Sequence, residues 1–341
     1  MKVLYIVPKS NFFYKGYTGS VNHVLGITSG LHEVFTLDIS ANDIDALQIE
    51  PNCRRVVPNS LTALKTIIGE YDLVIVRYSI SRVLYLFILR VVSLYYRVDV
   101  ILEVNSLYGN TTSKFSGAIF RYVEKPILKV YKNVQVVSPN MRNWLMSRGV
   151  ANVFYVPNGH NISEQLPCKF VKTESDSLIY IGSFKEYYNF QQYNRFCKSY
   201  NVIGNIYGSN DISGYPYLSF HGKFNFLTGN IVIFHGDILI LPYKAGTLAD
   251  IGFPIKLCEY LAMQLPIVCS NTGVLKQIMS PINAGLMYTD GDDHSLNEAY
   301  NFAKRLSGIE RIKLLKKYSE LLAELEWSHL ARFIVEKRNY E

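Results

Sequence analysis

The sequence predicts an α/β fold made of two doubly wound domains in series. Short runs of aliphatic and β-branched residues alternate with segments of helical periodicity, which is typical of parallel sheets covered by helices on both faces. The alternation begins again after the loop Val156-Pro157-Asn158-Gly159. With 341 residues, 49% hydrophobic and 18% charged, the chain can bury two separate cores and is too apolar for a disordered protein.

Each expected element follows from its local pattern. Strands of the first domain are expected at residues 2–7, 34–39, 72–77, 98–104 and 134–137. Strands of the second are expected at 177–182, 202–208, 237–242 and 266–270, with helices beginning near 255, 293 and 309. The parts are an N-terminal domain (1–165), a C-terminal domain (166–322) and a charged helix around Trp327 (323–341) that can pack back on the first domain. Ligands are expected in a cleft between the carboxyl ends of the two sheets.

Cysteine usage and hydropathy favour a cytoplasmic protein. The five cysteines are an odd number without a C-x-x-C pair, which argues against a disulfide framework and against a thiolate zinc site. The opening MKVLYIVPK is too short for the apolar core of a signal peptide. The most apolar stretch, Val83–Tyr96, contains Arg90 and is shorter than the roughly 20 residues that cross a bilayer, so no spanning helix is expected.

The net charge of +7 lies entirely in the first half of the chain. Residues 1–170 contain 18 Lys and Arg against 11 Asp and Glu, whereas residues 171–341 contain 17 of each. This asymmetry indicates an anionic partner, which nucleic acid, a lipid surface or a phosphorylated substrate would each satisfy.

Two loops carry the motifs with chemical content. Gly16-Tyr17-Thr18-Gly19-Ser20 follows the first strand and opens a helix, so it fits an anion-binding loop and an ordinary turn equally well. The segment Gly252–Ala262 is more informative, because Pro254 suits a helix start and Lys256 and Glu259 share one helical face close to it. A solvated ion pair is the plain interpretation. A cation at a helix N-terminus is unfavourable unless an anion binds there too, which favours a phosphate site.

These motifs together resemble retaining GT-B glycosyltransferases of family 4. Gly252–Ala262 followed by Pro266-Ile267-Val268 is similar to their C-terminal signature G-x-P-x-K-x-x-E-Y-x-A and P-V-V. The order of the other motifs also resembles the family, namely Thr18–Val24, Val156–Gly159, Tyr180–Phe184 and Asn283–Leu286. The resemblance covers most of the chain and implies a GT-B fold of two Rossmann-like domains. It implies a nucleotide-sugar donor, UDP-linked rather than GDP-linked, held by the second domain and an acceptor held by the first.

The resemblance also implies roles for individual residues. Glu259 matches the position that binds the donor ribose, and Lys256, beside Pro254, matches the basic residue assigned to the phosphates. The loop positions near the donor are matched by Gly19, Ser20, Gly182, Thr272 and Gly273. This chain departs from the family at Ile251, Ser183, Tyr188 and Asn105, which replace a glutamate, an arginine, a lysine and a histidine. Phosphate binding then falls to Lys256 with Lys185, while Asn105 can hydrogen-bond a sugar hydroxyl.

The implied reaction is glycosyl transfer with retention, in which the protein stabilises charge on the departing diphosphate. We expect no cofactor and no metal, because Asp292-Asp293 fits a helix cap better than a metal-binding pair. His23 is a candidate contact for the acceptor or a phosphate, and a packed helix histidine is the equal alternative. The acceptor is expected to be a glycan or a polyprenyl-linked saccharide in bacterial surface polysaccharide assembly.

A basic segment suggests a membrane surface. Within 117–132, a single helix would place Arg121, Lys125, Lys129 and Lys132 on one face, facing anionic lipid at the inner side of the cell membrane. An ordinary amphipathic surface helix, kinked or split at Pro126, is an equal interpretation.

The sequence leaves one alternative to glycosyl transfer and disfavours two others. An inactive or regulatory homologue that binds sugar nucleotides fits the departures at Ile251, Ser183 and Asn105. A dinucleotide-dependent oxidoreductase is disfavoured, since no strand is followed by G-x-G-x-x-G. Nucleic-acid binding is disfavoured because the aromatic residues fall inside strand and helix patterns, where core packing explains them.

Overall fold

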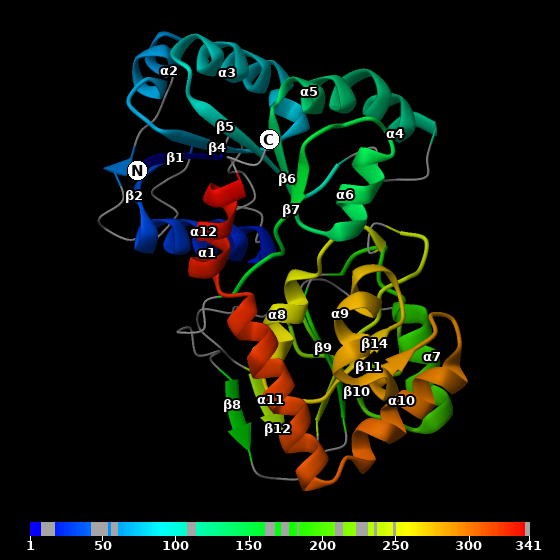
Figure 1. The fold of residues 1–341 in the computed structure, drawn as a ribbon. Helices are drawn as coiled ribbons and strands as arrows, with labels where there is room; N and C mark the ends of the chain where they lie inside the picture. The colour runs from blue at the N-terminus through cyan, green and yellow to red at the C-terminus, as the bar shows by residue number, and fades with distance from the viewer. Residues whose placement is uncertain are drawn as a thin grey trace. The chain divides into compact units, whose positions relative to one another are not determined.

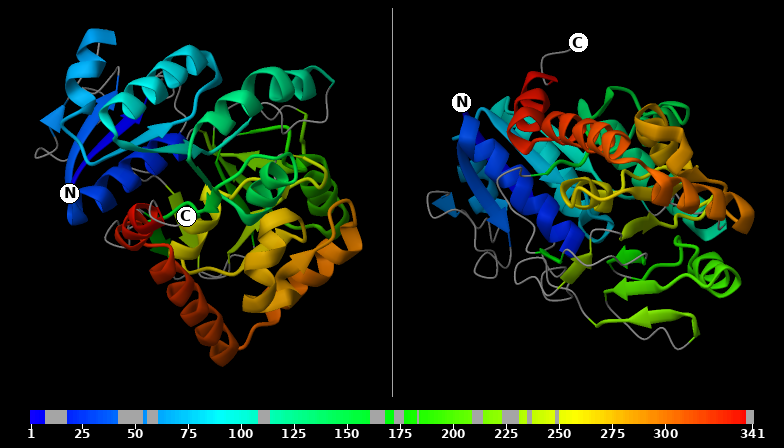
Figure 2. Two further views of the ribbon diagram at one scale, coloured as in Figure 1. Left: turned by 45° about the horizontal axis from the view of Figure 1, so that its top comes forward. Right: turned by 90° about the horizontal axis from the view of Figure 1, so that it is seen from below.

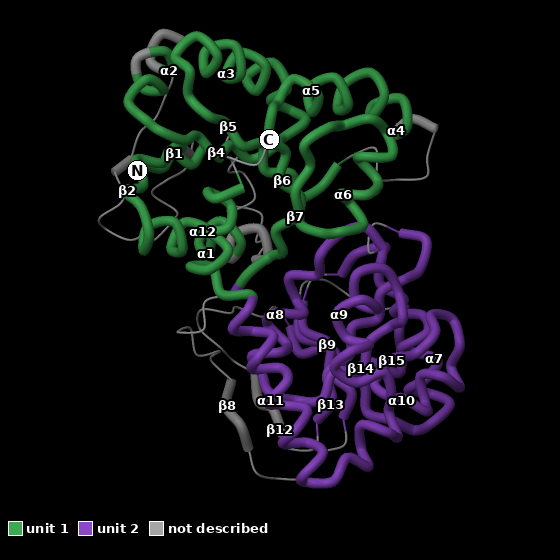
Figure 3. The backbone as a smooth tube through the Cα atoms, viewed as in Figure 1, with its two compact units in different colours: residues 1–159, 325–341 green, residues 160–324 purple. Residues whose placement is uncertain are grey.

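The chain divides into two units, residues 1–159 with 325–341 and residues 160–324 (Figure 3). The computed structural model describes residues 1–7, 18–41, 54–55, 61–107, 114–160, 168–171, 177–182, 184–208, 214–222, 231–234, 237–247 and 250–337. The first division falls at 159/160, where the sequence suggested 165/166. Asn158 bonds to His23 of unit 1 and Gly159 packs against Trp327, so this loop stays with the first unit.

Unit 1 contains a parallel sheet of seven strands in the order β3-β2-β1-β4-β5-β6-β7. The strands are β1 (Lys2–Val7), β2 (Thr36–Ala41), β3 (Arg54–Arg55), β4 (Leu73–Arg77), β5 (Asp99–Val104), β6 (Asn133–Val136) and β7 (Val153–Tyr155). Their order reverses between β1 and β4, as in doubly wound folds. The five strands expected from the sequence are confirmed, and β3 and β7 extend the sheet at its edges.

Helices cover both faces of this sheet. They are α1 (Thr18–Val34), α2 (Leu61–Ile68), α3 (Val83–Tyr96), α4 (Lys114–Ile119), a π-helix (Phe120–Glu124), α5 (Lys125–Val130), α6 (Pro139–Met146) and α12 (Trp327–Glu336), with a 3₁₀ turn at Ile80–Arg82. Helices α1 and α12 lie on one face of the sheet, and α2, α3 and α5 form a row on the other (Figure 1). Figure 2 shows this row from two other directions. Since side chains alternate along each strand, both faces of β1 are buried.

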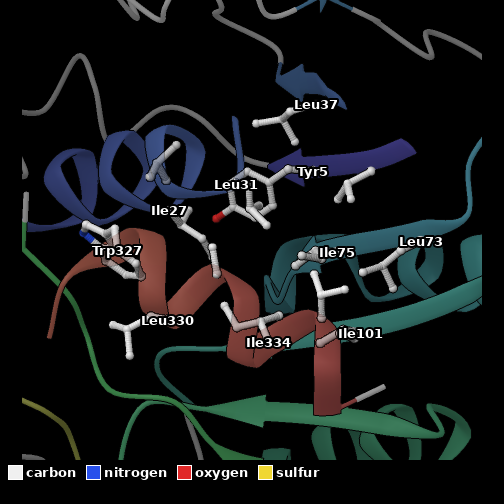
Figure 4. Packing of buried hydrophobic residues seen from close by; sticks show 14 of the residues in the cluster. Tyr5, Ile27, Leu31, Leu37, Leu73, Ile75, Ile101, Trp327, Leu330 and Ile334 are labelled. Atoms are coloured by element: carbon white, nitrogen blue, oxygen red, sulfur yellow. The ribbon is translucent and has the colours of Figure 1, made fainter. Parts of the chain in front are cut away.

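The C-terminal helix α12 belongs to the core of unit 1. Trp327, Leu330 and Ile334 pack against Ile27 and Leu31 of α1 (Figure 4). A Cβ atom on Gly26 would overlap the indole of Trp327, so the glycine lets the two helices approach. The last segment of the chain therefore completes a core begun by the first strand.

Unit 2 contains a second parallel sheet, in the order β11-β10-β9-β13-β14-β15. Its strands are β9 (Leu178–Ile181), β10 (Gly204–Tyr207), β11 (Leu218–Phe220), β13 (Ile238–Leu241), β14 (Ile267–Ser270) and β15 (Met287–Tyr288). A separate parallel pair joins β8 (Cys168–Val171) to β12 (Ile231–Phe234). The four strands expected in this domain are all present.

The helices of unit 2 are α7 (Phe190–Tyr200), α8 (Ile255–Ala262), α9 (Gly273–Asn283), α10 (Asp293–Arg305) and α11 (Gly308–Glu324). Helix α8 packs on α11 and α7 packs on α10. Asp292 caps α10, with its Oδ1 accepting from the amides of His294 (2.9 Å) and Ser295 (3.1 Å). The interpretation of Asp292-Asp293 as a helix cap is confirmed.

Candidate functional site

The order of the second sheet reverses between β9 and β13, which is where open α/β sheets bind ligands. Strand β9 ends at Ile181 and is followed by Gly182, while β13 ends at Leu241 and is followed by Pro242 and Tyr243. Helix α8 is tied to this edge through Tyr260, whose hydroxyl oxygen accepts from the amide of Ile181 (2.7 Å). The tyrosine thus fixes α8 against the carboxyl end of β9.

Lys256 and Gly182 are brought together at this edge. Gly182 has φ +141°, and a Cβ atom there would overlap Cε and Nζ of Lys256, so a side chain would strain the backbone and displace the lysine. The Lys256 ammonium lies 5.8 Å from the ring centroid of Tyr180 and 5.5 Å from that of Tyr188. Both distances are within cation–π range. The sequence motifs placed Gly182 and Lys256 in one site, and the structure puts them in contact.

The tyrosines around Lys256 form a buried aromatic wall. Burial raises the pKa values of Tyr180, Tyr188, Tyr243 and Tyr260 well above the usual phenol value, so these side chains are neutral. Glu259, itself buried, adds to the rise in the pKa of Tyr243 and Tyr260 through its negative charge. The charged groups of this edge are therefore supplied by α8 rather than by the phenols.

Two helices start here without a side-chain cap among the described residues. Pro254 is the N-cap of α8, and Thr272 is the N-cap of α9. The Thr272 hydroxyl instead lies 3.1 Å from the Ser270 hydroxyl, and Gly273 opens α9 with φ +48°. Amides of an uncapped first turn remain available to an anion, and the helix dipole favours negative charge there. Lys256, in the first turn of α8, would be unfavourable without such an anion.

The other residues proposed for the donor site lie in several parts of the chain. Lys185 is half-buried, and its carbonyl accepts from the amide of Tyr188 (3.1 Å). Ser183 lies outside the described residues. Gly19 and Ser20 fall in the first turn of α1, in unit 1, where the backbone is described. The loop before them, from Gly16, lies outside the described residues.

His23 and Asn105 meet at a buried carboxylate in unit 1. His23 Nε2 lies 2.5 Å from Glu103 Oε1, and its Nδ1 lies 2.7 Å from Asn158 Oδ1. The Asn105 amide donates to the same Glu103 oxygen (2.7 Å), and the Tyr5 hydroxyl donates to the other (2.7 Å). The Glu103 carboxylate accepts from the Nε2 side of the imidazole, and the Asn158 side-chain amide bonds to its Nδ1 side.

Glu103 stays ionised in this cluster. Burial alone raises the pKa of its carboxyl, but the charge and hydrogen bond of His23, the Arg77 charge and the Tyr5 hydrogen bond together lower it to about 2. The sequence did not identify Glu103 as a site residue. The structure engages both nitrogens of His23, which is only 2% exposed, so the ring anchors α1 to β5 and to the loop at Asn158. This geometry fits a positioning residue rather than one that contacts substrate.

The basic segment 117–132 differs from the single helix expected. A π-helix at Phe120–Glu124 separates α4 from α5, and Pro126 sits in the first turn of α5 without a break. Lys132 lies beyond the end of α5, so it does not belong to the helical run that carries Arg121, Lys125 and Lys129. Arg121, Lys129 and Lys132 are exposed, and Lys125 is half-buried.

Within the described ranges, no group of three His, Cys, Asp or Glu side chains could hold a metal ion. In that same part of the chain, no helix combines the length and the apolar character needed to cross a bilayer.

The sequence matches no protein-family model and no curated protein, whereas solved structures match over the whole chain. Sucrose-phosphate synthase from Thermosynechococcus elongatus superposes with a TM-score of 0.62 and 15% identity, covering 98% of each chain. The Anabaena protein HepE, solved with UDP and glucose, gives 0.65 and 11% identity over 98% of each chain. Trehalose-6-phosphate synthase OtsA gives 0.66 and 11% identity over 100% of each. At these identities the likeness concerns the fold, and the chain has the GT-B fold.

Proposed function

We propose that this chain is a glycosyltransferase that uses a nucleotide-sugar donor, with UDP as the nucleotide. The observation that carries the proposal is Lys256, held against Gly182 at the reversal point of the second sheet beside the uncapped starts of α8 and α9. This is the arrangement a diphosphate requires. The structures of HepE with UDP, with UDP-glucose, and with UDP and glucose support a UDP-linked donor.

Each proposed site residue at the carboxyl edge of the second sheet has a role in binding the donor. Lys256, Lys185 and the first-turn amides at Thr272 and Gly273 bind the diphosphate, and Glu259 accepts hydrogen bonds from the ribose hydroxyls. Gly182 and Pro254 shape the backbone around them, and Ser183, Gly19 and Ser20 are further proposed donor contacts. Asn105 hydrogen-bonds a sugar hydroxyl, and His23 positions it through Glu103.

The reaction breaks the bond from the anomeric carbon to the diphosphate and forms one to an acceptor hydroxyl. Negative charge grows on the departing phosphate, so Lys256 and the helix starts stabilise the transition state more than the ground state. We propose retention, with the acceptor proton passing to the departing phosphate on the same face of the sugar. The charge of Lys256 makes a metal ion unnecessary.

The acceptor is proposed to be a lipid-linked saccharide in bacterial surface polysaccharide assembly, with the protein a member of family 4 at the inner face of the membrane. The support for this part is the motif resemblance and the positive charge of the first half of the chain. Unit 1 would hold this acceptor.

Calorimetric titration of UDP, GDP, ADP and CMP, with and without Mg²⁺, tests the proposal. We expect UDP to bind without metal, and Lys256→Ala to weaken it by roughly 1.5–3 kcal/mol, as for a hydrogen bond to a charged group. Lys313→Ala, on the exposed face of α11, is the matched control. A folded wild type that binds none of the four nucleotides would contradict the proposal. UDP binding without sugar transfer would instead support the inactive or regulatory homologue.

A further inference from the structure

Helix α3 presents an apolar face to solvent. Its exposed large side chains are Leu84, Phe87, Val91, Leu94, Tyr95 and Tyr96, with Leu84 72% and Tyr95 81% exposed. At 3.6 residues per turn the first five fall within an arc of about 100°, whereas Tyr96 lies outside this arc, against Gly69. The buried side chains Leu86, Leu89 and Val92 lie on the opposite side, so one apolar face anchors the helix and the other is left at the surface.

The helix next to α3 adds positive charge beside this face. Helices α3 and α5 are joined by the Arg90 guanidinium, which donates to the carbonyl of Val130 (2.7 Å), and by the Tyr131 hydroxyl, which donates to the carbonyl of Leu86 (2.6 Å). They lie side by side in the row of Figures 1 and 2. Lys129 of α5 is exposed, as are Arg121 and Tyr122 of the π-helix that precedes α5.

The charges along the chain from α3 to the end of α5 are mostly positive. Residues 78–132 contain eight Lys and Arg against three acidic residues, and two of those three, Glu103 and Glu124, are buried. Asp99, in the strand that follows, is the exposed one. On the other side of α3, α2 carries the exposed Lys65 and is followed by the exposed Glu70. Arg82 and Arg97 flank the two ends of α3 and are exposed. An apolar stripe bordered by cations is the surface that binds anionic lipid headgroups and the acyl boundary beneath them.

We propose that α3 docks unit 1 on an anionic lipid bilayer, lying in the membrane plane with Leu84, Phe87, Val91, Leu94 and Tyr95 inserted. Arg82, Arg97, Arg121 and Lys129 contact the headgroups. This inference rests on the membrane location included in the proposed function. It assigns the apolar contact with the bilayer to α3, whereas the sequence suggested residues 117–132. Fourteen helical residues span about 21 Å, enough for a helix that lies on a bilayer and too short for one that crosses it.

A second copy of the chain is a poorer occupant of this face. A two-fold interface would place the cations that border α3 against the same cations of the partner. Five side chains are also few beside the roughly 20–30 residues that each partner contributes to a standard interface. An anionic bilayer supplies charge opposite to these cations, and the narrow apolar face of α3 is wide enough to insert into it.

Flotation with lipid vesicles, without donor or acceptor, tests the inference. The wild type is compared on vesicles of equimolar phosphatidylglycerol and phosphatidylcholine and on vesicles of phosphatidylcholine alone. We expect binding to the anionic vesicles that weakens with salt, and a loss of about tenfold or more in the double variant Leu84→Gln, Leu94→Gln. The matched control is Ile309→Gln, Ile312→Gln, two side chains of α11 that are each 69% exposed. It should bind as the wild type does.

A fluorescence measurement locates the contact directly. Phe87→Trp should shift its emission to the blue when anionic vesicles are added, after subtraction of the wild-type signal from Trp144 and Trp327. A wild type that does not float, an α3 variant that floats equally well, or a dimer that Leu94→Gln converts to monomers would each overturn the inference. A chain that floats but binds no UDP keeps the inference and removes the proposed function.

Discussion

The backbone of Gly182 lies against the side chain of Lys256, so closely that a Cβ atom at position 182 would displace the lysine side chain. The contact joins the end of β9 to the first turn of α8, the two elements that form the proposed diphosphate site. The position of the lysine ammonium therefore depends on a glycine far from it in the sequence.

Gly182→Ala is expected to lower UDP affinity about ten- to a hundredfold by displacing Lys256, and to reduce the melting temperature through strain at φ +141°. Calorimetry of UDP and thermal unfolding measure the two effects. Gly291→Ala is the matched control, because it has φ +85° and nothing within 4 Å of the added carbon. It should show the strain alone. Equal UDP affinity in both variants would contradict the role of the Gly182 contact.

Tyr260→Phe is expected to cost about 1–3 kcal/mol in the free energy of unfolding, because it leaves the buried amide of Ile181 without its partner. It should also weaken UDP binding, since this bond holds α8 at the end of β9. Tyr318→Phe removes a similar bond to the amide of Ile267, at the start of β14 (3.2 Å). That variant should lose stability but keep its UDP affinity. If both variants bind UDP as the wild type does, the position of α8 does not depend on Tyr260.

Because Glu103 is ionised in the folded protein, the free energy of unfolding of unit 1 should fall at acid pH. Its pKa in the folded protein, about 2, is below the ordinary value of 4.5, so its contribution is present above about pH 4.5 and is lost as the pH falls toward 2. The shift corresponds to roughly 3 kcal/mol. Glu103→Gln should be less stable at neutral pH and should flatten this fall, measured by denaturant unfolding between pH 2 and 7. A fall as steep as that of the wild type would show that other carboxyl groups cause it.

Trp327→Ala is expected to destabilise unit 1 by about 3–5 kcal/mol, as for a large aromatic side chain removed from a core. UDP binding by unit 2 should persist at temperatures where the unit remains folded. Trp144→Ala, on the half-buried face of α6, is the milder comparison. Differential scanning calorimetry checks the prediction. An unchanged transition for unit 1 would mean that α12 is not part of its core.

The sequence by itself determined the two doubly wound sheets, because near-continuous apolar runs such as residues 3–7 and Ile238–Leu241 are typical of strands that are buried on both faces. It also determined that Lys256 and Glu259 share a helix, since their spacing is local. The helix cap at Asp292 was also determined by the sequence, because the cap bonds to an amide only two residues away.

Only the tertiary structure decided the contacts that join distant segments. The close contact of Gly182 with Lys256 and the bonds of His23 to Glu103 and Asn158 join different elements, and no local periodicity encodes them. The π-helix at Phe120–Glu124 and the end of α5 at Val130 are also tertiary outcomes, and they leave Lys132 outside the helix expected over 117–132. Helix α3 is apolar all around, so its sequence could not say which side meets the sheet. Packing against β5 and α5 buried one face and left Leu84 and Leu94 outside.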